Sequence, residues 1–214
     1  MHTLITSYAE GNCYQIAPQL ATKFSTNMAQ KTAILLIADG SEELETVAVA
    51  DVLRRARIDV TVASTTGNKC VKCSRNVMIC ADAQIQDAVK DKKYDVVILP
   101  GGLGGTEAFI SSTEVKQLLQ EQEKENRLIA AICAAPTALQ AHGIAKGKQL
   151  TSYPSMKDKL VNDYKYLEEK VVVDGNLITS RGPGTAIDFG LAIVEKLLDK
   201  EAANNVAGPM LHKM

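Results

Sequence analysis

Three short apolar segments constrain the fold of this 214-residue chain more than any other feature. They are residues 33–38, 94–99 and 128–132, and almost every position in them is apolar. Runs of this length, apolar at successive rather than alternate positions, are typical of parallel strands covered on both faces. Each run is followed by glycine or other small residues and then by a segment with helical spacing. This alternation predicts an α/β protein, in which a mainly parallel sheet lies between two layers of helices.

The segments between these strands fit the same plan. Ser111 and Glu114 have the spacing of a capping box and predict the start of a helix. Asp174 and Gly175 favour the tight turn of a hairpin. The other expected elements are a strand at residues 59–63, a strand or hairpin beside the sheet at 70–80, a hairpin at 171–179, and helices that end at Arg55 and span 186–198.

Composition and charge exclude several classes of protein. Lys and Arg number 24 against 25 Asp and Glu, a net charge of −1, which gives no electrostatic basis for binding nucleic acid or an anionic membrane. No apolar run approaches the ~18–20 residues that a membrane span needs. The 46% hydrophobic content is that of a folded domain.

Residues 1–30 differ from the rest of the chain. They contain one Glu (Glu10), one Lys (Lys23) and no Arg, and their apolar residues show no clear period. A low acid content and many Ser and Thr are weakly suggestive of a transit peptide, but such peptides are rich in Arg. We expect a disordered extension at residues 1–30, with Met28 as an alternative start, followed by one α/β domain at residues 31–214.

The cysteines indicate thiol chemistry rather than a disulfide framework. Their number is odd and they are scattered, so we expect reduced thiols. Cys70 and Cys73 form a C-x-x-C pair, but no second pair follows and the chain has only three histidines. We therefore interpret the pair as a coincidence and expect no metal site. The five cysteines are Cys13, Cys70, Cys73, Cys80 and Cys133.

Three loops are expected to form the functional site. In sheets of this kind, ligands bind where the strands deliver their carboxyl ends. The loops at residues 38–45, 100–105 and 132–136 follow the three apolar strands and should meet at that edge.

Cys133 is the leading candidate nucleophile. It lies between the strand at 128–132 and a helix that begins near Pro136, which is the arrangement of a nucleophile elbow. The helix N-terminus favours a thiolate, and its amides can form an oxyanion hole with the Gly102 amide. The alternative is a buried structural cysteine, which is a common role for this residue type.

Four acids follow the first strand: Asp39, Glu42, Glu43 and Glu45. Carboxylates at a helix start commonly act only as caps. One of them within reach of Cys133 would instead exchange protons with the thiol. Spacing alone does not identify that acid.

Several blocks of the sequence, taken together, resemble the DJ/PfpI superfamily, in particular the protein deglycases of animals. That superfamily shares a flavodoxin-like fold with class I glutamine amidotransferases, so the resemblance implies a flavodoxin-like three-layer sandwich. It extends from about residue 31 to the C-terminus. The blocks are residues 38–46, 51–56, 73–75, 95–102, 130–137 and 179–185.

The resemblance implies roles for individual residues. Cys133 matches the oxidation-sensitive nucleophile, and Glu45 matches the acid that hydrogen-bonds to it. Gly102 and Ala134 match the backbone amides that line the pocket.

Further matches are less directly tied to chemistry. Arg75 and Arg181 match basic residues near the pocket, with hydrogen bonds that anchor turns as the alternative role. Cys73 and Cys80 match two further redox-modifiable cysteines, and for Cys80 simple packing is the preferred interpretation.

One position departs from the family pattern. Tyr153 stands where the vertebrate members carry His, so a Cys–His dyad is missing, and Tyr153 is at most a binding residue near the pocket. His142 is expected to pack within a helix. A cysteine peptidase is therefore disfavoured, because no histidine is placed as the base.

The resemblance implies a cofactor-independent glyoxalase or protein deglycase that protects against oxidative stress. Cys133 would attack methylglyoxal, glyoxal or their early adducts on protein or nucleotide groups. The alternative is a redox sensor or chaperone in which Cys133 is oxidised to a sulfinate without essential turnover. The resemblance further implies a homodimer, located in the cytoplasm with the nucleus and mitochondrion as further sites.

Overall fold

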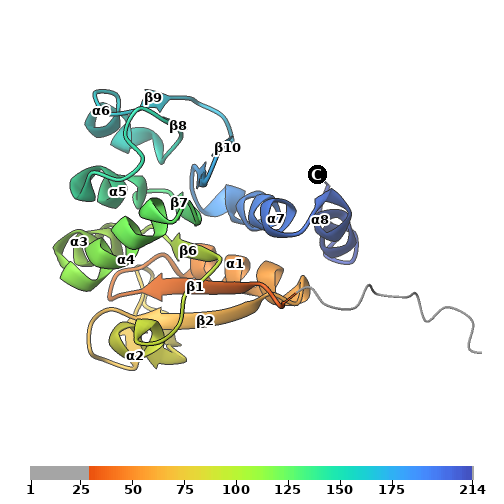
Figure 1. Ribbon diagram of the computed structural model, residues 1–214, viewed down its shortest axis with the longest axis horizontal. Helices are drawn as coiled ribbons and strands as arrows, with labels where there is room; N and C mark the ends of the chain where they lie inside the picture. The colour runs from red at the N-terminus through yellow and green to blue at the C-terminus, as the bar shows by residue number, and fades with distance from the viewer. Residues whose placement is uncertain (1–28, 214) are drawn as a thin grey trace, which may run out of the picture.

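The structure, a computed structural model, describes residues 29–213 (Figure 1). Most of the extension expected at residues 1–30, including Met28 and Cys13, lies outside the described residues. Seven strands form one sheet in the order β10-β11-β7-β6-β1-β2-β5, and only the β10–β11 pair is antiparallel. The strands are β1 (Thr32–Ile37), β2 (Asp59–Ser64), β5 (Ala83–Gln84), β6 (Val96–Leu99), β7 (Leu128–Ile132), β10 (Val171–Asp174) and β11 (Leu177–Ser180).

The strand order confirms the predicted flavodoxin-like fold. Read from β2 through β1, β6 and β7 to β11, the five central strands have the order 2-1-3-4-5 of flavodoxin-like sheets. The point at which this order reverses lies between β1 and β6, where ligand sites of such folds are found.

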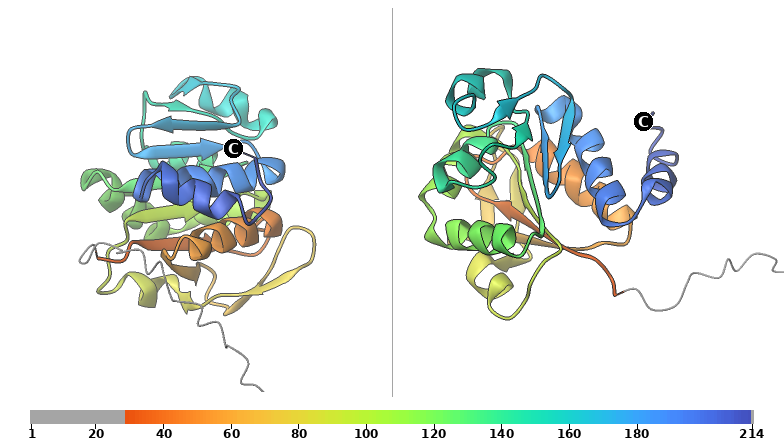
Figure 2. Two further views of the ribbon diagram at one scale, coloured as in Figure 1. Left: turned by 90° about the vertical axis from the view of Figure 1, so that its right-hand side faces the viewer. Right: turned by 45° about the horizontal axis from the view of Figure 1, so that its top comes forward.

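Helices cover both faces of the sheet (Figures 1 and 2). Alternate residues of β1 enter two separate cores: Leu35 packs toward α1 and α7, and Leu36 packs toward α3, α4 and α5. This two-sided burial explains the continuous apolar runs. The helices are α1 (Glu43–Arg55), α2 (Ile85–Val89), α3 (Leu103–Ser111), α4 (Thr113–Lys124), α5 (Pro136–His142), α6 (Lys157–Leu160), α7 (Ala186–Leu197) and α8 (Lys200–Ala207), with 3-10 turns η1 (Pro154–Met156) and η2 (Pro183–Thr185).

Local signals were confirmed with one correction. Gly175 has φ 61° in the β10–β11 turn, as the Asp174-Gly175 pair predicts. The cap of α4 is Ser112 and not Ser111: the Ser112 Oγ accepts a hydrogen bond from the Val115 amide at 3.2 Å. Ser112 has extended backbone, which a cap needs, whereas Ser111 is the last residue of α3.

A hairpin outside the main sheet corrects the expectation of reduced thiols. It consists of β3 (Cys70–Lys72) and β4 (Met78–Cys80), and a disulfide joins Cys70 to Cys80. The two cysteines are directly opposite across the antiparallel pair, a relation that appears only once the register of the hairpin is known. A second small sheet pairs β8 (Gln149–Leu150) with β9 (Lys165–Tyr166).

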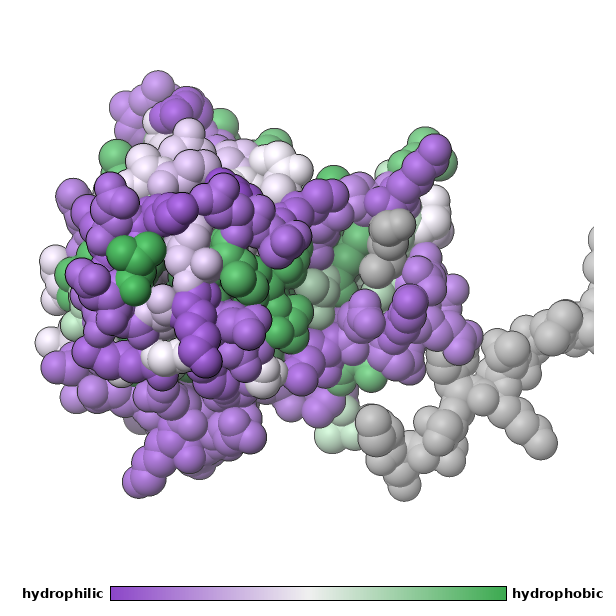
Figure 3. All heavy atoms as spheres, turned by 90° about the horizontal axis from the view of Figure 1, so that it is seen from above, coloured by the Kyte–Doolittle hydropathy of each residue, from purple (hydrophilic) through white to green (hydrophobic). Residues whose placement is uncertain are grey.

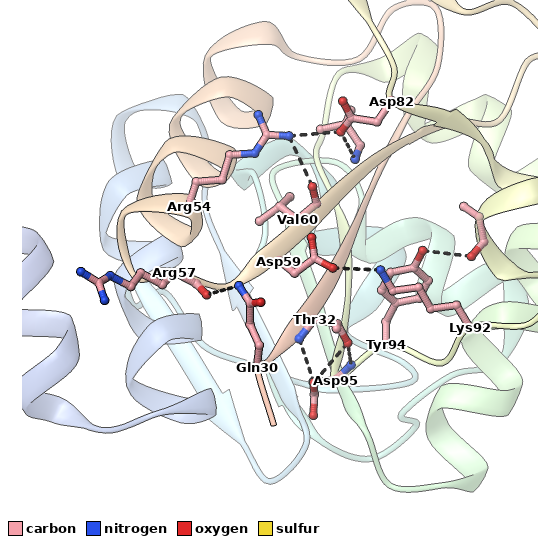
Figure 4. A network of polar contacts seen from close by, with 12 residues as sticks. Gln30, Thr32, Arg54, Arg57, Asp59, Val60, Asp82, Lys92, Tyr94 and Asp95 are labelled. Atoms are coloured by element: carbon pink, nitrogen blue, oxygen red, sulfur yellow. Dashed lines mark hydrogen bonds and ion pairs between the residues drawn. The ribbon is translucent and has the colours of Figure 1, made fainter. Parts of the chain in front are cut away.

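Paired charges hold the amino edge of the sheet together (Figure 4). Asp95 precedes β6 and accepts hydrogen bonds from the Thr32 amide at 2.8 Å and from Lys31 Nζ at 3.1 Å. Asp59 at the start of β2 pairs with Lys92 at 3.0 Å. These contacts fasten the beginnings of three neighbouring strands, at the edge opposite to the three predicted loops.

Two surface properties bear on function. None of the helices in residues 29–213 is long and apolar enough to cross a membrane. The face seen in Figure 3 is mainly hydrophilic, and its hydrophobic residues form small separate groups.

Candidate active site

The three predicted loops meet at the carboxyl edge of the sheet and border a cavity of about 630 Å³. Segments from the hairpin and from the region after β8 complete its wall. The lining residues are Gly40, Glu42, Ser74, Arg75, Gly102, Leu103, Gly104, Cys133, Ala134, Tyr153, Ser155, Met156 and Pro183.

Cys133 lines this cavity directly after β7, with 9% of its surface exposed. Its backbone has φ 64°, in the left-handed region that residues with a side chain rarely adopt. Two hydrogen bonds hold this conformation: the Cys133 amide donates to the Ser180 carbonyl at 3.0 Å, and the Tyr153 amide donates to the Cys133 carbonyl at 2.8 Å. The structure thus places Cys133 on a sharp, strained turn between a strand and a helix, the geometry of a nucleophile elbow.

Glu45 lies beside the thiol. It belongs to the first turn of α1, is fully buried, and interacts with the Cys133 side chain. The Gly101 amide donates a hydrogen bond to Glu45 Oε2 at 2.7 Å, whereas Oε1 has no hydrogen-bond partner among residues 29–213. A buried carboxyl with one strong donor and no cation is poorly compensated, which is typical of a group held for chemistry.

Because Gly101 has no side chain, the Cys133 thiol and the Glu45 carboxyl fit beside it. A Cβ atom there would lie 2.5 Å from Cys133 Cβ and 2.8 Å from Glu45 Oε2. Any larger residue would therefore separate the thiol from the carboxyl. Gly101 was not among the predicted site residues; its signal in the sequence is the Pro-Gly-Gly segment that follows a buried strand.

Burial shifts the pKa of both groups upward. Burial raises the pKa of Glu45 from its ordinary 4.5 to about 7, although the Gly101 amide and the thiol oppose the shift. Burial and the nearby Glu45 raise the pKa of Cys133 to about 12. This is opposite to the lowered thiol pKa expected from the helix N-terminus, because desolvation and a neighbouring carboxylate outweigh the amides. At neutral pH the thiol therefore keeps its proton in the free protein, and Glu45 is the adjacent group to which this proton can pass when the sulfur reacts.

Two backbone amides face the thiol. Those of Gly102 and Ala134 hydrogen-bond to Cys133 and lower its pKa, against the larger opposing effects. Gly102 has φ 83°, and a Cβ there would lie 2.1 Å from the Gly40 carbonyl oxygen. The close approach of the two loops therefore requires glycine, and it brings the Gly102 amide to the sulfur.

The other three acids of the first loop have structural roles. Glu42 caps α1 by accepting a hydrogen bond from the Glu45 amide at 2.8 Å. Asp39 accepts from the Lys72 amide at 2.7 Å. Glu43 accepts from the Arg75 amide at 2.8 Å and so holds the tip of the hairpin.

The three candidate binding residues are placed differently. Arg75 and Tyr153 line the cavity and are exposed. Arg181 is not among the lining residues; its charge acts on Glu168 instead. The structure therefore brings Arg75 and Tyr153 to the site and leaves Arg181 outside it.

Among residues 29–213, the other cysteines and the histidines do not line the cavity. Cys73 is buried, and burial together with nearby acids raises the pKa of its thiol to about 11. His142 Nε2 contacts the Phe109 carbonyl, and His212 pairs with Asp188, so neither histidine is a partner of Cys133. Within residues 29–213, no cluster of three His, Cys, Asp or Glu side chains is arranged to hold a metal ion.

Comparison with known proteins finds the same family at the level of sequence and of structure. The sequence model of the DJ-1/PfpI family matches residues 31–196. The chain is 56% identical over 182 residues to Protein dj-1beta of Drosophila melanogaster, covering 85% of this chain and 97% of that protein. It is 40% identical over 184 residues to the glutathione-independent glyoxalase DJR-1.2 of Caenorhabditis elegans, covering 85% and 97%. The crystal structure of Drosophila melanogaster DJ-1beta superposes with a TM-score of 0.85 at 54% identity, covering 87% of this chain and all of that one.

Proposed function

Because the chain belongs to the DJ-1/PfpI family, we propose that it is a glyoxalase that converts small α-oxoaldehydes to hydroxy acids without a cofactor, with Cys133 as nucleophile. The observation that supports this most directly is the buried Glu45 beside the Cys133 thiol, with its pKa raised to about 7. The 40% identity to a protein named as a glutathione-independent glyoxalase supports the same reaction class.

In the first step the Cys133 sulfur attacks the aldehyde carbon of methylglyoxal, and Glu45 accepts the thiol proton. The new C–S bond gives a hemithioacetal, whose oxygen carries the negative charge. The amides of Gly102 and Ala134 already point to the sulfur, so they are placed to donate to this oxygen.

In the second step Glu45 first gives the thiol proton to the hemithioacetal oxygen. Its carboxylate then carries a proton from the former aldehyde carbon to the former ketone carbon, while the hydroxyl proton passes to the former ketone oxygen. This transfer needs a group that both accepts and donates a proton near pH 7, which describes Glu45. The adduct becomes a thioester of lactate, and hydrolysis by one water releases lactate and restores the thiol. Glyoxal would give glycolate by the same steps.

The test is lactate production from methylglyoxal by Cys133→Ser, for which we expect a loss of about a thousandfold or more. Cys73→Ser is the matched control, because Cys73 is also a buried free thiol but does not line the cavity. Turnover in Cys133→Ser within tenfold of the native rate would exclude Cys133 as the nucleophile.

The deglycase activity is a finer part of the proposal. The same attack on a hemithioacetal or hemiaminal of a protein or nucleotide would release the repaired thiol or amine. A preformed adduct of methylglyoxal with N-acetylcysteine separates the two reactions. At a fixed concentration of free aldehyde, the rate should rise with adduct concentration if adducts are substrates, and should not change if only free aldehyde is used.

A redox sensor is the second candidate function, and the protonation of Glu45 favours it. A carboxyl with a pKa of about 7 is partly protonated at neutral pH and can donate a hydrogen bond to an oxygen added to the sulfur. Mass spectrometry after graded peroxide should then show sulfinate at Cys133 before oxidation of Cys73. If Glu45→Gln leaves the extent of Cys133 oxidation unchanged, this function is contradicted.

We also propose that the protein is a homodimer, as the family resemblance implies. Leu44 and Val47 on α1 are each 56% exposed, and Met78 in the hairpin is 57% exposed. Sedimentation equilibrium of the native chain and of Val47→Glu would test whether this region joins two copies. The cytoplasmic location, with nucleus and mitochondrion as further sites, stays a prediction.

A further inference from the structure

We infer that Cys70 and Cys80 form a second thiol–disulfide site, separate from Cys133, which exchanges with small thiols and disulfides and clamps one wall of the cavity. The wall in question is the β3–β4 hairpin. The inference goes beyond the proposed glyoxalase activity, and its test does not depend on turnover.

The register of the hairpin places the two sulfur atoms together. Cys70 and Cys80 are direct partners in the antiparallel pair, with their Cα atoms 3.9 Å apart. The flanking bond from the Ala81 amide to the Lys69 carbonyl, at 2.7 Å, identifies them as a non-hydrogen-bonded pair. Side chains at such pairs approach each other most closely, so this register brings the two sulfur atoms within bonding reach.

In the single chain, the pair is also accessible to small molecules. Cys80 is exposed and Cys70 is half-buried, whereas Cys73 and Cys133 are buried. Exchange requires in-line approach of a thiolate to a sulfur atom, and accessibility therefore favours Cys80 as the point of attack.

The clamp is linked to the cavity through the tip of the hairpin. Ser74 and Arg75 at this tip line the cavity, and both are hydrogen-bonded to Glu43. The disulfide closes the opposite, open end of the hairpin. Because a two-stranded hairpin is only marginally stable by itself, a cross-link at its open end limits the freedom of the tip.

The oxidant in the exchange reaction is a low-molecular-weight disulfide. The Cys80 thiolate attacks one sulfur of the small disulfide, which forms a mixed disulfide and releases one small thiol. The Cys70 thiolate then attacks the Cys80 sulfur, forms the intrachain bond and releases the second thiol. Two protein thiols are oxidised, one small disulfide is reduced to two thiols, and the two protein protons pass to the released thiolates.

The first experiment equilibrates the native protein in buffers of defined reduced to oxidised glutathione ratio. Free thiols are then alkylated and the peptides mapped by mass spectrometry. We expect a peptide pair linked through Cys70 and Cys80 in oxidising buffer and two alkylated cysteines in reducing buffer, with Cys73 alkylated only after unfolding. A pair that stays reduced in every buffer, or a Cys80–Cys80 link between two copies, would overturn the inference.

The second experiment measures amide hydrogen exchange of the oxidised and reduced native protein. We expect exchange at Val71 and Ile79 to become at least about tenfold faster on reduction, with β1 unchanged as the internal control. The variant Cys70→Ser/Cys80→Ser should resemble the reduced native protein in both buffers. Equal protection of the hairpin in both redox states would overturn the clamp.

Discussion

Two carboxyl groups at opposite edges of the same sheet, Asp95 and Glu45, have opposite surroundings. The Asp95 side chain is about a third exposed. Burial by itself raises the pKa of Asp95, but the Thr32 amide and Lys31 together have the larger effect, and the pKa is lowered overall. Glu45 is fully buried with one amide donor, and its pKa is raised to about 7. Asp95 directly precedes β6, and Glu45 lies in the first turn of α1.

The contrast between Asp95 and Glu45 shows how the surroundings at each edge of the sheet determine the role of a carboxyl group. At the amino edge, donors and cations satisfy the carboxylates, and the result is structural. At the carboxyl edge the fold supplies Glu45 with few partners, so its pKa lies near 7 and both its protonated and its ionised forms are populated at neutral pH. The burial and the donors, rather than the residue type, decide whether an acid stabilises the fold or serves its chemistry.

The largest effect expected is on turnover in Glu45→Gln. The amide cannot accept the thiol proton, so lactate formation should fall by about a hundredfold or more. In the native protein, turnover should rise with pH through an apparent pKa of about 7, as Glu45 becomes ionised. Steady-state rates between pH 5 and 9 test both statements. A native rate that does not vary over this range would contradict the role of Glu45 as proton acceptor.

Glu45→Gln, which should lower turnover, should raise the free energy of unfolding relative to the native protein as the pH increases. The folded pKa of Glu45 lies above its unfolded value of 4.5, so the unfolded chain binds fewer protons between pH 4.5 and 7. Native stability is therefore lost as the pH rises through this window. Relative to the native protein, Glu45→Gln should gain about 3 kcal/mol between pH 4.5 and pH 8. Denaturant unfolding at both pH values measures this difference.

Gly101→Ala should disturb the thiol and carboxyl without changing either group. The added Cβ meets Cys133 and Glu45 at less than 3 Å, so we expect about tenfold or greater loss of turnover and about 1–3 kcal/mol of destabilisation. Gly184→Ala is the matched control, because no atom lies within 4 Å of its added Cβ. Native activity in Gly101→Ala would show that the pair tolerates separation.

A smaller effect, on KM, should distinguish Arg75 from Arg181. Arg75→Ala removes a cation from the cavity wall and should raise KM several-fold with little change in kcat. Arg181→Ala should change neither by more than about twofold, because Arg181 does not line the cavity. Kinetics with methylglyoxal compare the two variants, and a larger effect of Arg181→Ala would contradict this placement.

Asp95→Asn should leave turnover unchanged and thus completes the comparison with Glu45→Gln. Loss of the ionised partner of Lys31 and of the Thr32 amide should cost about 1 kcal/mol at pH 7. The folded pKa of Asp95 is lowered, so its contribution is present above the unfolded value and is lost as the pH falls through the folded one. The destabilisation should therefore diminish in acid, which unfolding at pH 7 and pH 3 would show.

Much of the fold follows from local sequence. The strand expected at residues 128–132 is β7 without change, and the run at 33–38 is β1 shifted by one residue. The run at 94–99 becomes β6 at residues 96–99, although the Asp95 backbone still bonds to Thr32 and Leu128 on its two sides, and the Tyr94 hydroxyl donates to the Ala88 carbonyl. The hydrophobic periodicity of the sequence does not reveal such tertiary contacts.

The site was predicted less completely. Position after a strand identified Cys133, and family resemblance, not spacing, selected Glu45 among four acids. The position of Arg181, the lack of space at Gly101 and the Cys70–Cys80 disulfide depend on how separate segments approach each other. The raised pKa of Cys133 likewise depends on burial and on Glu45, which a helix N-terminus considered by itself does not include.

The donors that face the Cys133 sulfur are main-chain amides, and this determines which mutations the site tolerates. Apart from proline, no residue at position 102 or 134 deletes the backbone N–H group, so truncation of side chains around the cavity would leave this part of the machinery intact. Enlargement is different, because the loops approach each other at glycines with no space for another atom. Inactivating changes should therefore concentrate in substitutions that add volume, and an alanine scan restricted to larger side chains would underestimate how much of this site is under constraint.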